Sequence, residues 1–325
     1  MKSIISVTLG IIASIFPSVS QNVDYSVVYV PEETNLHFKQ ITSTSDYVCM
    51  PIVKRTRNSI NWLTNKIIDI SYDGKKIAYL SYRNEKTNIF IKDLDNKGGS
   101  IQRTQRNAIL DFQYSPDGKN ICFSETKGKT NQIFITDAEK GYICRQITNG
   151  NKDYSPVYSD NMKDLFFSRQ ETNDLSIWSY NMEGNYLSSY SSGINPCPIK
   201  GETAYLCVRT NHEGKSEIWK VNYITGTEEY IISDSEKSFT SPTISPDGKW
   251  ILFVGESKIT ADNFTYLNTD LYVARIDGTE LTQITYHAAD DLSPVWSKDG
   301  KKIYFISQRG SKEGIANIWQ IDFVY

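Results

Sequence analysis

The chain has 325 residues and a formal net charge of −3, with 22% charged and 39% hydrophobic residues. This near-neutral balance argues against a nucleic-acid-binding protein, which needs a basic face. By length alone the chain is one large domain or two. After residue 20 it has no apolar stretch long enough to cross a membrane as a helix.

The first 20 residues have the layout of a secretory signal peptide. Lys2 precedes an apolar run of 13 residues over 4–16, and Ser18 and Ser20 are small residues before a cleavage point ahead of Gln21. The run is shorter than the roughly 20 residues that span a bilayer, although an uncleaved anchor is the alternative. Because the residue directly after the cleavage point is Gln21 and not Cys, lipid attachment is not expected. We expect a periplasmic or secreted protein without a membrane span.

Three segments precede the first complete repeat. Residues 21–34 form a short N-terminal segment with no clear pattern. The stretch NLHFKQIT at 35–42 has the pattern of a strand that closes each later repeat. Residues 43–66 fit no repeat, and are expected to be a decorated loop or part of an additional unit.

From residue 67 onward, one pattern recurs at intervals of 40 to 52 residues. Each copy has an alternating run, an Asp-Gly turn and a second alternating run, as in SPTISPDGKWILFV at 241–254. The Asp position of this turn is occupied in order by Asp73, Asp117, Asn161, Gly201, Asp247 and Asp299. An aliphatic–aromatic pair such as Ile318-Trp319 follows in every copy, and RQIT or TQIT closes two copies. Repetition at this period is typical of propellers and other arrays.

One copy translates into four antiparallel strands, which we call a to d. An Asp-Gly turn between alternating runs is a strong hairpin signal, and the runs carry the β-branched and aromatic residues of half-buried strands. A single four-stranded sheet exposes both faces, and radial stacking buries them. The sequence therefore predicts an all-β fold, a six-bladed β-propeller over 35–325, with seven blades as the alternative. The segment 35–42 is expected to supply the strand d that the last copy lacks.

The five cysteines do not form a disulfide framework, because their number is odd and they are sparse. Cys197 and Cys207 flank one predicted hairpin turn, and a disulfide between them is one interpretation. The other is that all five are small buried apolar groups.

The SPDGKxIxF core, followed by IW, Asp and then LT or IT, resembles the TolB-type propeller repeat. This WD-like repeat belongs to bacterial envelope proteins, and the resemblance covers residues 35–325. It implies a periplasmic, monomeric propeller that binds an envelope protein without catalysis and without a cofactor. TolB carries a separate α/β domain before its propeller, and the roughly 15 residues between the predicted cleavage point and residue 35 leave no room for one. That departure puts a role in the Tol system in doubt.

Strand alternation places the a–b and c–d turns on one side of the predicted disc, and the longer b–c and d–a loops on the other. We expect the second side to be functional, because binding residues concentrate on variable loops over a rigid scaffold. It includes a long predicted b–c loop at 255–270. The candidate binding residues on that side are Asp153, Tyr154, Tyr266, His287, Asp290 and Asp291. The aspartates have an alternative role, capping the turn into strand a through bonds to their own backbone.

No catalytic motif supports an enzyme. The chain has no G-x-S-x-G nucleophile elbow and only three histidines, without the His-rich cluster used by propeller lyases that cleave oligogalacturonate. A glycosidase needs two carboxylates across a pocket, and Asp153 and Asp291, on different predicted blades, could in principle serve. We therefore expect no enzyme activity, no metal and no cofactor. Carbohydrate binding through exposed aromatic residues is the first alternative, and a polysaccharide lyase or hydrolase is the second.

Overall fold

The computed structural model describes residues 25, 30–51, 53–55, 60–62, 66–95, 98–172, 174–261 and 264–324. The predicted signal peptide lies outside these residues. Two 3-10 helices, η2 (Pro31–Glu33) and η3 (Thr44–Asp46), precede the repeats, and the remaining elements are strands. Within the described part of the chain, no helix has the length and hydropathy that crossing a bilayer requires.

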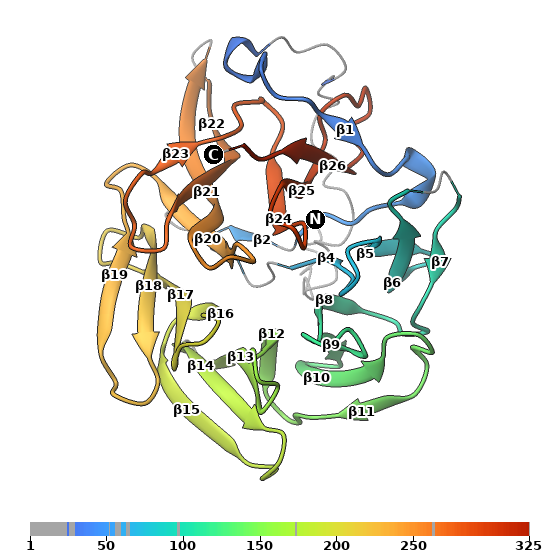
Figure 1. The fold of residues 1–325 in the computed structure, drawn as a ribbon, viewed down its shortest axis with the longest axis vertical. Helices are drawn as coiled ribbons and strands as arrows, with labels where there is room; N and C mark the ends of the chain where they lie inside the picture. The colour runs from blue at the N-terminus through green and yellow to red at the C-terminus, as the bar shows by residue number, and fades with distance from the viewer. Residues whose placement is uncertain are drawn as a thin grey trace, which may run out of the picture.

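The described strands form six antiparallel groups of four and one separate hairpin. Four groups are independent sheets, with the orders β4-β5-β6-β7, β16-β17-β18-β19, β20-β21-β22-β23 and β1-β26-β25-β24. The groups β8–β11 and β12–β15 belong to one eight-stranded sheet, joined by a single parallel pair between Asn131 and Lys152. Figure 1 shows the groups around a central axis, with strand a of each group innermost. The predicted all-β propeller fold is confirmed.

The strand bounds follow in chain order: β1 (Lys39–Gln40), β2 (Val53–Arg55), β3 (Ile60–Trp62), β4 (Ile68–Ile70), β5 (Lys76–Arg83), β6 (Lys86–Asp93), β7 (Ile101–Gln102), β8 (Ile109–Tyr114), β9 (Asn120–Lys127), β10 (Thr130–Asp137), β11 (Cys144–Gln146), β12 (Lys152–Tyr158), β13 (Asp164–Glu171), β14 (Asp174–Asn181), β15 (Leu187–Ser192), β16 (Ile194–Pro198), β17 (Ala204–Thr210), β18 (Ser216–Asn222), β19 (Glu228–Ile232), β20 (Ser238–Ile244), β21 (Trp250–Ala261), β22 (Phe264–Arg275), β23 (Thr282–Gln283), β24 (Asp291–Trp296), β25 (Lys302–Ser307) and β26 (Asn317–Asp322).

The repeated a–b turn has a physical reason for its residue types. In the first copy, Ser71 Oγ donates to Asp73 Oδ1 at 2.6 Å and accepts the backbone N–H of Lys76 at 3.0 Å. The Asp73 carboxylate also accepts the backbone N–H of Lys75. The side chains of Ser71 and Asp73 therefore bond the backbone N–H donors of the turn. Gly74 supplies the positive φ of 71°. In the third copy Met162 occupies this position at φ 57°, which an L side chain adopts only with strain.

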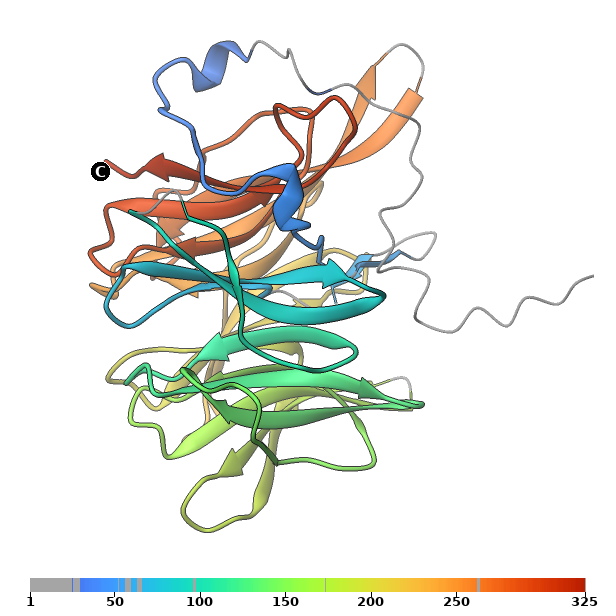
Figure 2. The same ribbon diagram turned by 90° about the vertical axis from the view of Figure 1, so that its right-hand side faces the viewer.

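The N-terminal strand closes the ring, as predicted. β1 pairs antiparallel with β26, with Lys39 opposite Gln320 and Gln40 opposite Trp319. The Ile41 N–H extends the ladder by donating to Ile318 O at 2.8 Å. Figures 1 and 2 show this blue segment beside the red C-terminal strands. The last group therefore contains strands from both ends of the described chain.

Two segments differ in detail from expectation. Residues 255–270 were predicted as a long b–c loop, and this prediction is wrong, because β21 and β22 continue as a hairpin with Gly255 opposite Asp270 and Ala261 opposite Phe264. Antiparallel pairing satisfies the backbone N–H and C=O groups of this stretch. Within 43–66, β2 and β3 pair only with each other, so the described part of that segment adds a hairpin.

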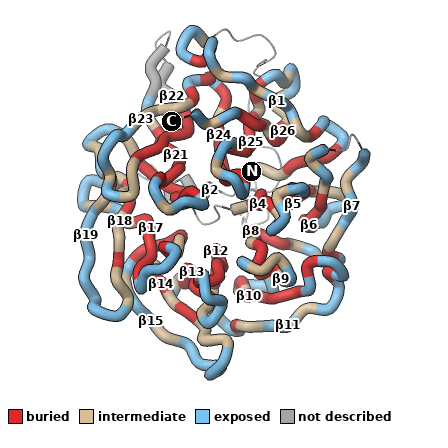
Figure 3. The backbone as a smooth tube through the Cα atoms, in the orientation of Figure 1, coloured by how far each residue is buried: buried red, intermediate tan, exposed pale blue. Residues whose placement is uncertain are grey.

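The core lies between neighbouring groups. Figure 3 shows buried backbone positions gathered in the inner and middle strands, with exposed positions at turns and outer strands. Aromatic residues of strands b and c fill the gaps, as in the stacked pair Phe123–Phe134, whose ring centroids are 5.5 Å apart. Trp319 packs against a cluster that includes Trp250 and Phe305. The aromatic residues of strands c therefore serve in packing.

The five cysteines are unpaired. The register sets Cys197 opposite Leu206, so Cys207 points to the other face of that sheet. The interpretation of a Cys197–Cys207 disulfide is therefore wrong. Burial raises the pKa of both thiols, that of Cys207 to about 12.

Replacing Gly141 with alanine is expected to destabilise the fold more than the same change at Gly128. Both glycines have positive φ, 68° and 62°, which costs an alanine about 1–2 kcal/mol. A Cβ on Gly141 would lie 2.0 Å from the Arg103 carbonyl oxygen of the preceding group, whereas a Cβ on Gly128 meets nothing within 4 Å. We expect Gly141→Ala to cost about 2 kcal/mol more. Equal urea midpoints for the two variants would contradict this reading of the contact.

Candidate functional site

Asp153 and Tyr154 lie inside the third group, on β12. The Asp153 carboxylate accepts two bonds from Arg169 on β13, at 2.7 Å from Nε and 3.1 Å from the second guanidinium nitrogen. Both side chains are buried, and the guanidinium stands 4.5 Å from the Trp178 ring centre. Tyr154 is also buried, which raises its pKa to about 12. Asp153 is thus held by an ion pair within its own group, and Tyr154 is packed in the interior.

Asp291 takes part in a second buried ion cluster, at the start of β24. Arg309 donates to Asp291 Oδ2 at 2.6 Å and to the two carboxylate oxygens of Glu33 at 3.1 and 3.3 Å. The guanidinium also lies 4.1 Å from the ring centre of Phe38. Glu33 further accepts the backbone N–H of Tyr286 at 2.7 Å. One arginine therefore ties the N-terminal segment to the last group.

His287, Asp290 and Tyr266 lie near this cluster, at the variable-loop end of the fifth and sixth groups. His287 is buried, its Nδ1 accepts the Ala289 N–H at 2.9 Å, and its ring centre is 6.0 Å from that of Tyr25. Asp290 accepts the N–H and hydroxyl of Thr269 at 3.1 and 2.9 Å. Tyr266 is two-fifths exposed. The structure thus brings four of the six candidates together and places Asp153 and Tyr154 on another group.

Replacing His287 with asparagine is expected to reduce acid sensitivity. Burial, with the Arg309 charge, lowers the pKa of His287 to about 4 from 6.5. Between pH 6.5 and 4 the unfolded chain therefore takes up a proton that the folded chain does not. The free energy of unfolding consequently falls as the pH falls through that range, by about 2 kcal/mol. Asparagine offers an acceptor near Nδ1 and binds no proton.

Urea unfolding at pH 7 and pH 4.5 measures this difference. We expect His287→Asn to lose less stability than wild type between the two pH values. The matched control is His212→Asn, because the His212 side chain is exposed. If wild type and His287→Asn lose equal stability, His287 does not carry the acid effect.

Asp270, on β22, is a buried acid that sequence reasoning missed. Its Oδ2 accepts from Asn268 Nδ2 at 3.0 Å and Gln283 Nε2 at 3.2 Å, while Oδ1 has no hydrogen-bond partner among the described residues. Burial, followed by the negative charge of Asp291, raises the pKa of Asp270 to about 8. Asp270 therefore carries its proton at pH 7. Its position in a segment predicted as a loop gave no signal of burial.

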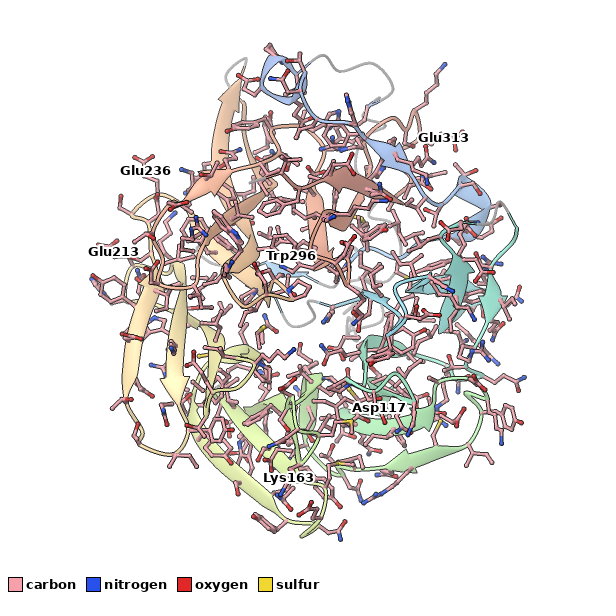
Figure 4. The ribbon with its side chains drawn as sticks, viewed as in Figure 1. Asp117, Lys163, Glu213, Glu236, Trp296 and Glu313 are labelled. Carbon is pink, nitrogen blue, oxygen red and sulfur yellow. The ribbon has the colours of Figure 1, made fainter. Side chains whose placement is uncertain are left out.

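A ring of small polar side chains from strands a surrounds the axis. Asp111 is fully buried and accepts the Ser155 N–H at 2.8 Å and the Ser124 hydroxyl, and burial raises its pKa to about 6. Ser155 Oγ donates to Asn195 Oδ1 of the next group at 3.0 Å. Trp296, labelled near the centre of Figure 4, donates from its indole N–H to Thr243 O at 3.2 Å. A cavity of about 50 Å³ lies among these strands, with Asp111, Ser155 and Asn195 in its lining, and has room for a few waters.

A wider groove of about 540 Å³ lies where the N-terminal segment meets the loop after β25. Its described lining includes Gln40, Tyr47, Lys312 and Asn317. The Tyr47 side chain is exposed, has a left-handed backbone at φ 49°, and carries the Arg83 guanidinium 5.6 Å from its ring centre. Among the described residues, no three His, Cys, Asp or Glu side chains are arranged to hold a metal ion.

Antiparallel groups around an axis, closed by a strand from the opposite end, define a β-propeller. The chain belongs to the TolB beta propeller domain family, whose model matches residues 27–261. This agrees with the resemblance seen in the repeats.

Solved structures show the same fold in proteins with different activities. The chain is similar to the putative TolB from Agrobacterium tumefaciens, with a TM-score of 0.58, 15% identity, and coverage of 82% of this chain and 92% of that one. TolB from Acinetobacter baumannii has a TM-score of 0.59 and 18% identity, over 77% of this chain and 64% of that one. Oligogalacturonate lyase from Vibrio parahaemolyticus has a TM-score of 0.59 and 14% identity, over 90% of this chain and 95% of that one. At these identities the likeness shows the fold alone.

Proposed function

We propose that this chain is a non-catalytic, protein-binding propeller of the cell envelope, periplasmic or secreted. The observation that carries the proposal is that three of the predicted polar site residues make bonds inside the fold. Asp153 and Asp291 are buried in ion pairs, and His287 accepts an internal backbone bond. Because these groups are engaged within the fold, the exposed surface offers the contacts. Membership of the TolB propeller family supports the same role.

The variable-loop surface around Tyr266 and Asp290 is the proposed binding region within that role. Tyr266 and Tyr286 are each about two-fifths exposed there. An amphipathic tyrosine is a favourable interface residue, because it buries a large rigid ring at low entropic cost and keeps a hydroxyl to bond.

Carbohydrate binding is a second candidate, favoured by the groove beside Tyr47. An exposed aromatic ring next to side-chain amides and hydroxyls suits a sugar, which stacks its apolar face and bonds through its edges. In this case Tyr47→Ala would weaken glycan binding at least tenfold and leave protein binding unchanged.

Native mass spectrometry of the folded protein, before and after incubation with envelope extract, tests the proposal. We expect a discrete complex with one envelope protein. Capture of glycan alone, lost in Tyr47→Ala, would establish the second candidate instead. A stoichiometric metal that is lost in His287→Ala, together with cleavage of oligogalacturonate, would overturn the proposal in favour of a lyase.

A further inference from the structure

Four exposed apolar side chains gather on the outer rim where the second and third groups meet. Tyr142 and Ile143, which lead into β11, are 63% and 75% exposed, and Tyr186 and Leu187, at the start of β15, are 58% and 42% exposed. Exposed aromatic and aliphatic residues that lie together mark an interaction site more often than scattered ones.

Arg145 joins the two halves of this surface. It extends from β11 to the third group, where it donates to Asn185 Oδ1 at 3.0 Å and Tyr180 Oη at 3.1 Å. Ile143 stands two residues before Arg145, directly before the first residue of β11. Asn185 directly precedes Tyr186, so the bond from Arg145 to Asn185 brings the chain segment at 142–145 next to the segment at 185–187. We call Tyr142, Ile143, Arg145, Tyr186 and Leu187 the Arg145 patch.

The Arg145 patch is ordered before any partner arrives. The Tyr186 ring packs on Gly184, since a Cβ added to Gly184 would fall 2.5 Å from a ring atom. The Thr136 hydroxyl donates to Ile143 O at 2.9 Å, which fixes the backbone leading into β11. The Tyr180 hydroxyl also donates to Asn185 Oδ1 at 2.7 Å. These contacts hold the patch in one conformation, which reduces the conformational entropy lost on binding. In Figure 4, the labels Asp117 and Lys163 mark the a–b turns of the two groups that carry the patch.

The charge of the patch indicates the chemistry of its partner. Both acceptors of Arg145 are neutral, and no carboxylate lies within ion-pair distance of Arg145 in the described residues. The patch itself contains no acid, so two copies facing each other would set arginine against arginine. A partner that places a carboxylate on Arg145 and apolar side chains on either side would satisfy the whole surface. Tyrosine and arginine are also the residue types that carry most binding energy in interfaces.

We infer that the Arg145 patch is a docking surface for an acidic protein segment, one that presents Asp or Glu beside an apolar anchor. This inference rests on the proposed protein-binding function and adds a second contact surface, away from Tyr266, together with the class of partner.

Site-specific photo-crosslinking tests the surface and the function separately. The crosslinker benzoylphenylalanine is placed at Ile143, at Ile224 and at Tyr266 in three full-length proteins. Ile224 is a matched control, an aliphatic residue 71% exposed in the c–d turn of the fourth group, away from the Arg145 patch. Each protein is irradiated in envelope extract, the captured protein is identified by mass spectrometry, and the purified partner is then titrated.

We expect position 143, and not 224, to capture one identified protein through a segment containing Asp or Glu. Arg145→Glu should then weaken binding at least tenfold, whereas Lys140→Glu, the same charge change in the same turn, should weaken it less than threefold. Equal effects of the two reversals, capture only from position 266, or capture of a second copy of this chain would each overturn the inference and leave the protein-binding function standing. No capture from any position would overturn both.

Discussion

Replacing Arg309 with methionine is expected to lower the free energy of unfolding by about 3–5 kcal/mol at neutral pH. Among the described residues, Arg309 is the one ion-pair partner of both Glu33 and Asp291, and all three side chains are at least 93% buried. Removing the guanidinium leaves two desolvated carboxylates without a countercharge. Methionine fills much of the volume over Phe38, so the loss reports charge rather than a cavity.

The matched control is Arg169→Met, which breaks the other buried pair, with Asp153. That pair joins two adjacent strands of one group, whereas Arg309 also holds the N-terminal segment through Glu33. Both variants should lose stability, but only Arg309→Met should speed hydrogen exchange at the Ile41 amide, which closes the ring by bonding to Ile318 O. If Ile41 exchanges equally fast in both variants, Arg309 does not stabilise the closure.

The fold was predictable because each copy of the repeat contains the residues that form its own turn and strands. Ser71 and Asp73 bond within their own turn, and Ser297 and Asp299 repeat the geometry in the last copy. The closing strand was also predictable, since residues 35–42 share the pattern of strand d. These signals are local, so a single sequence displays them.

The environment of the candidate residues could not be predicted in the same way. Asp153 and Asp291 were identified as polar residues at loop ends, but their partners Arg169 and Arg309 are ordinary arginines at the ends of alternating strands. Glu33 lies 276 residues from Arg309, outside every repeat. Whether a carboxylate faces solvent or a buried guanidinium depends on tertiary packing, which the repeat pattern does not encode.

Replacing Asp270 with asparagine is expected to stabilise the protein at pH 8 by about 5 kcal/mol. The pKa of Asp270 rises from 3.8 to about 8 on folding, and each unit corresponds to about 1.4 kcal/mol. The folded chain therefore keeps a proton that the unfolded chain has released above pH 4. In wild type this difference lowers the free energy of unfolding as the pH rises from 4 to 8, and the loss levels off above pH 8.

Asparagine removes this dependence and keeps the bonds. Its carbonyl can accept from Asn268 and Gln283 as Oδ2 does, and its uncharged amide no longer meets the repulsion of Asp291. Urea unfolding at pH 5 and pH 8 should therefore show a steep loss in wild type and a flatter response in Asp270→Asn. Asp160→Asn, at an exposed carboxylate in the a–b turn of the third group, is the control and should follow wild type. If Asp270→Asn instead loses stability at pH 8, the buried carboxyl group is ionised and held by the fold, and the acidic cluster around Arg309 then carries one more negative charge than we infer.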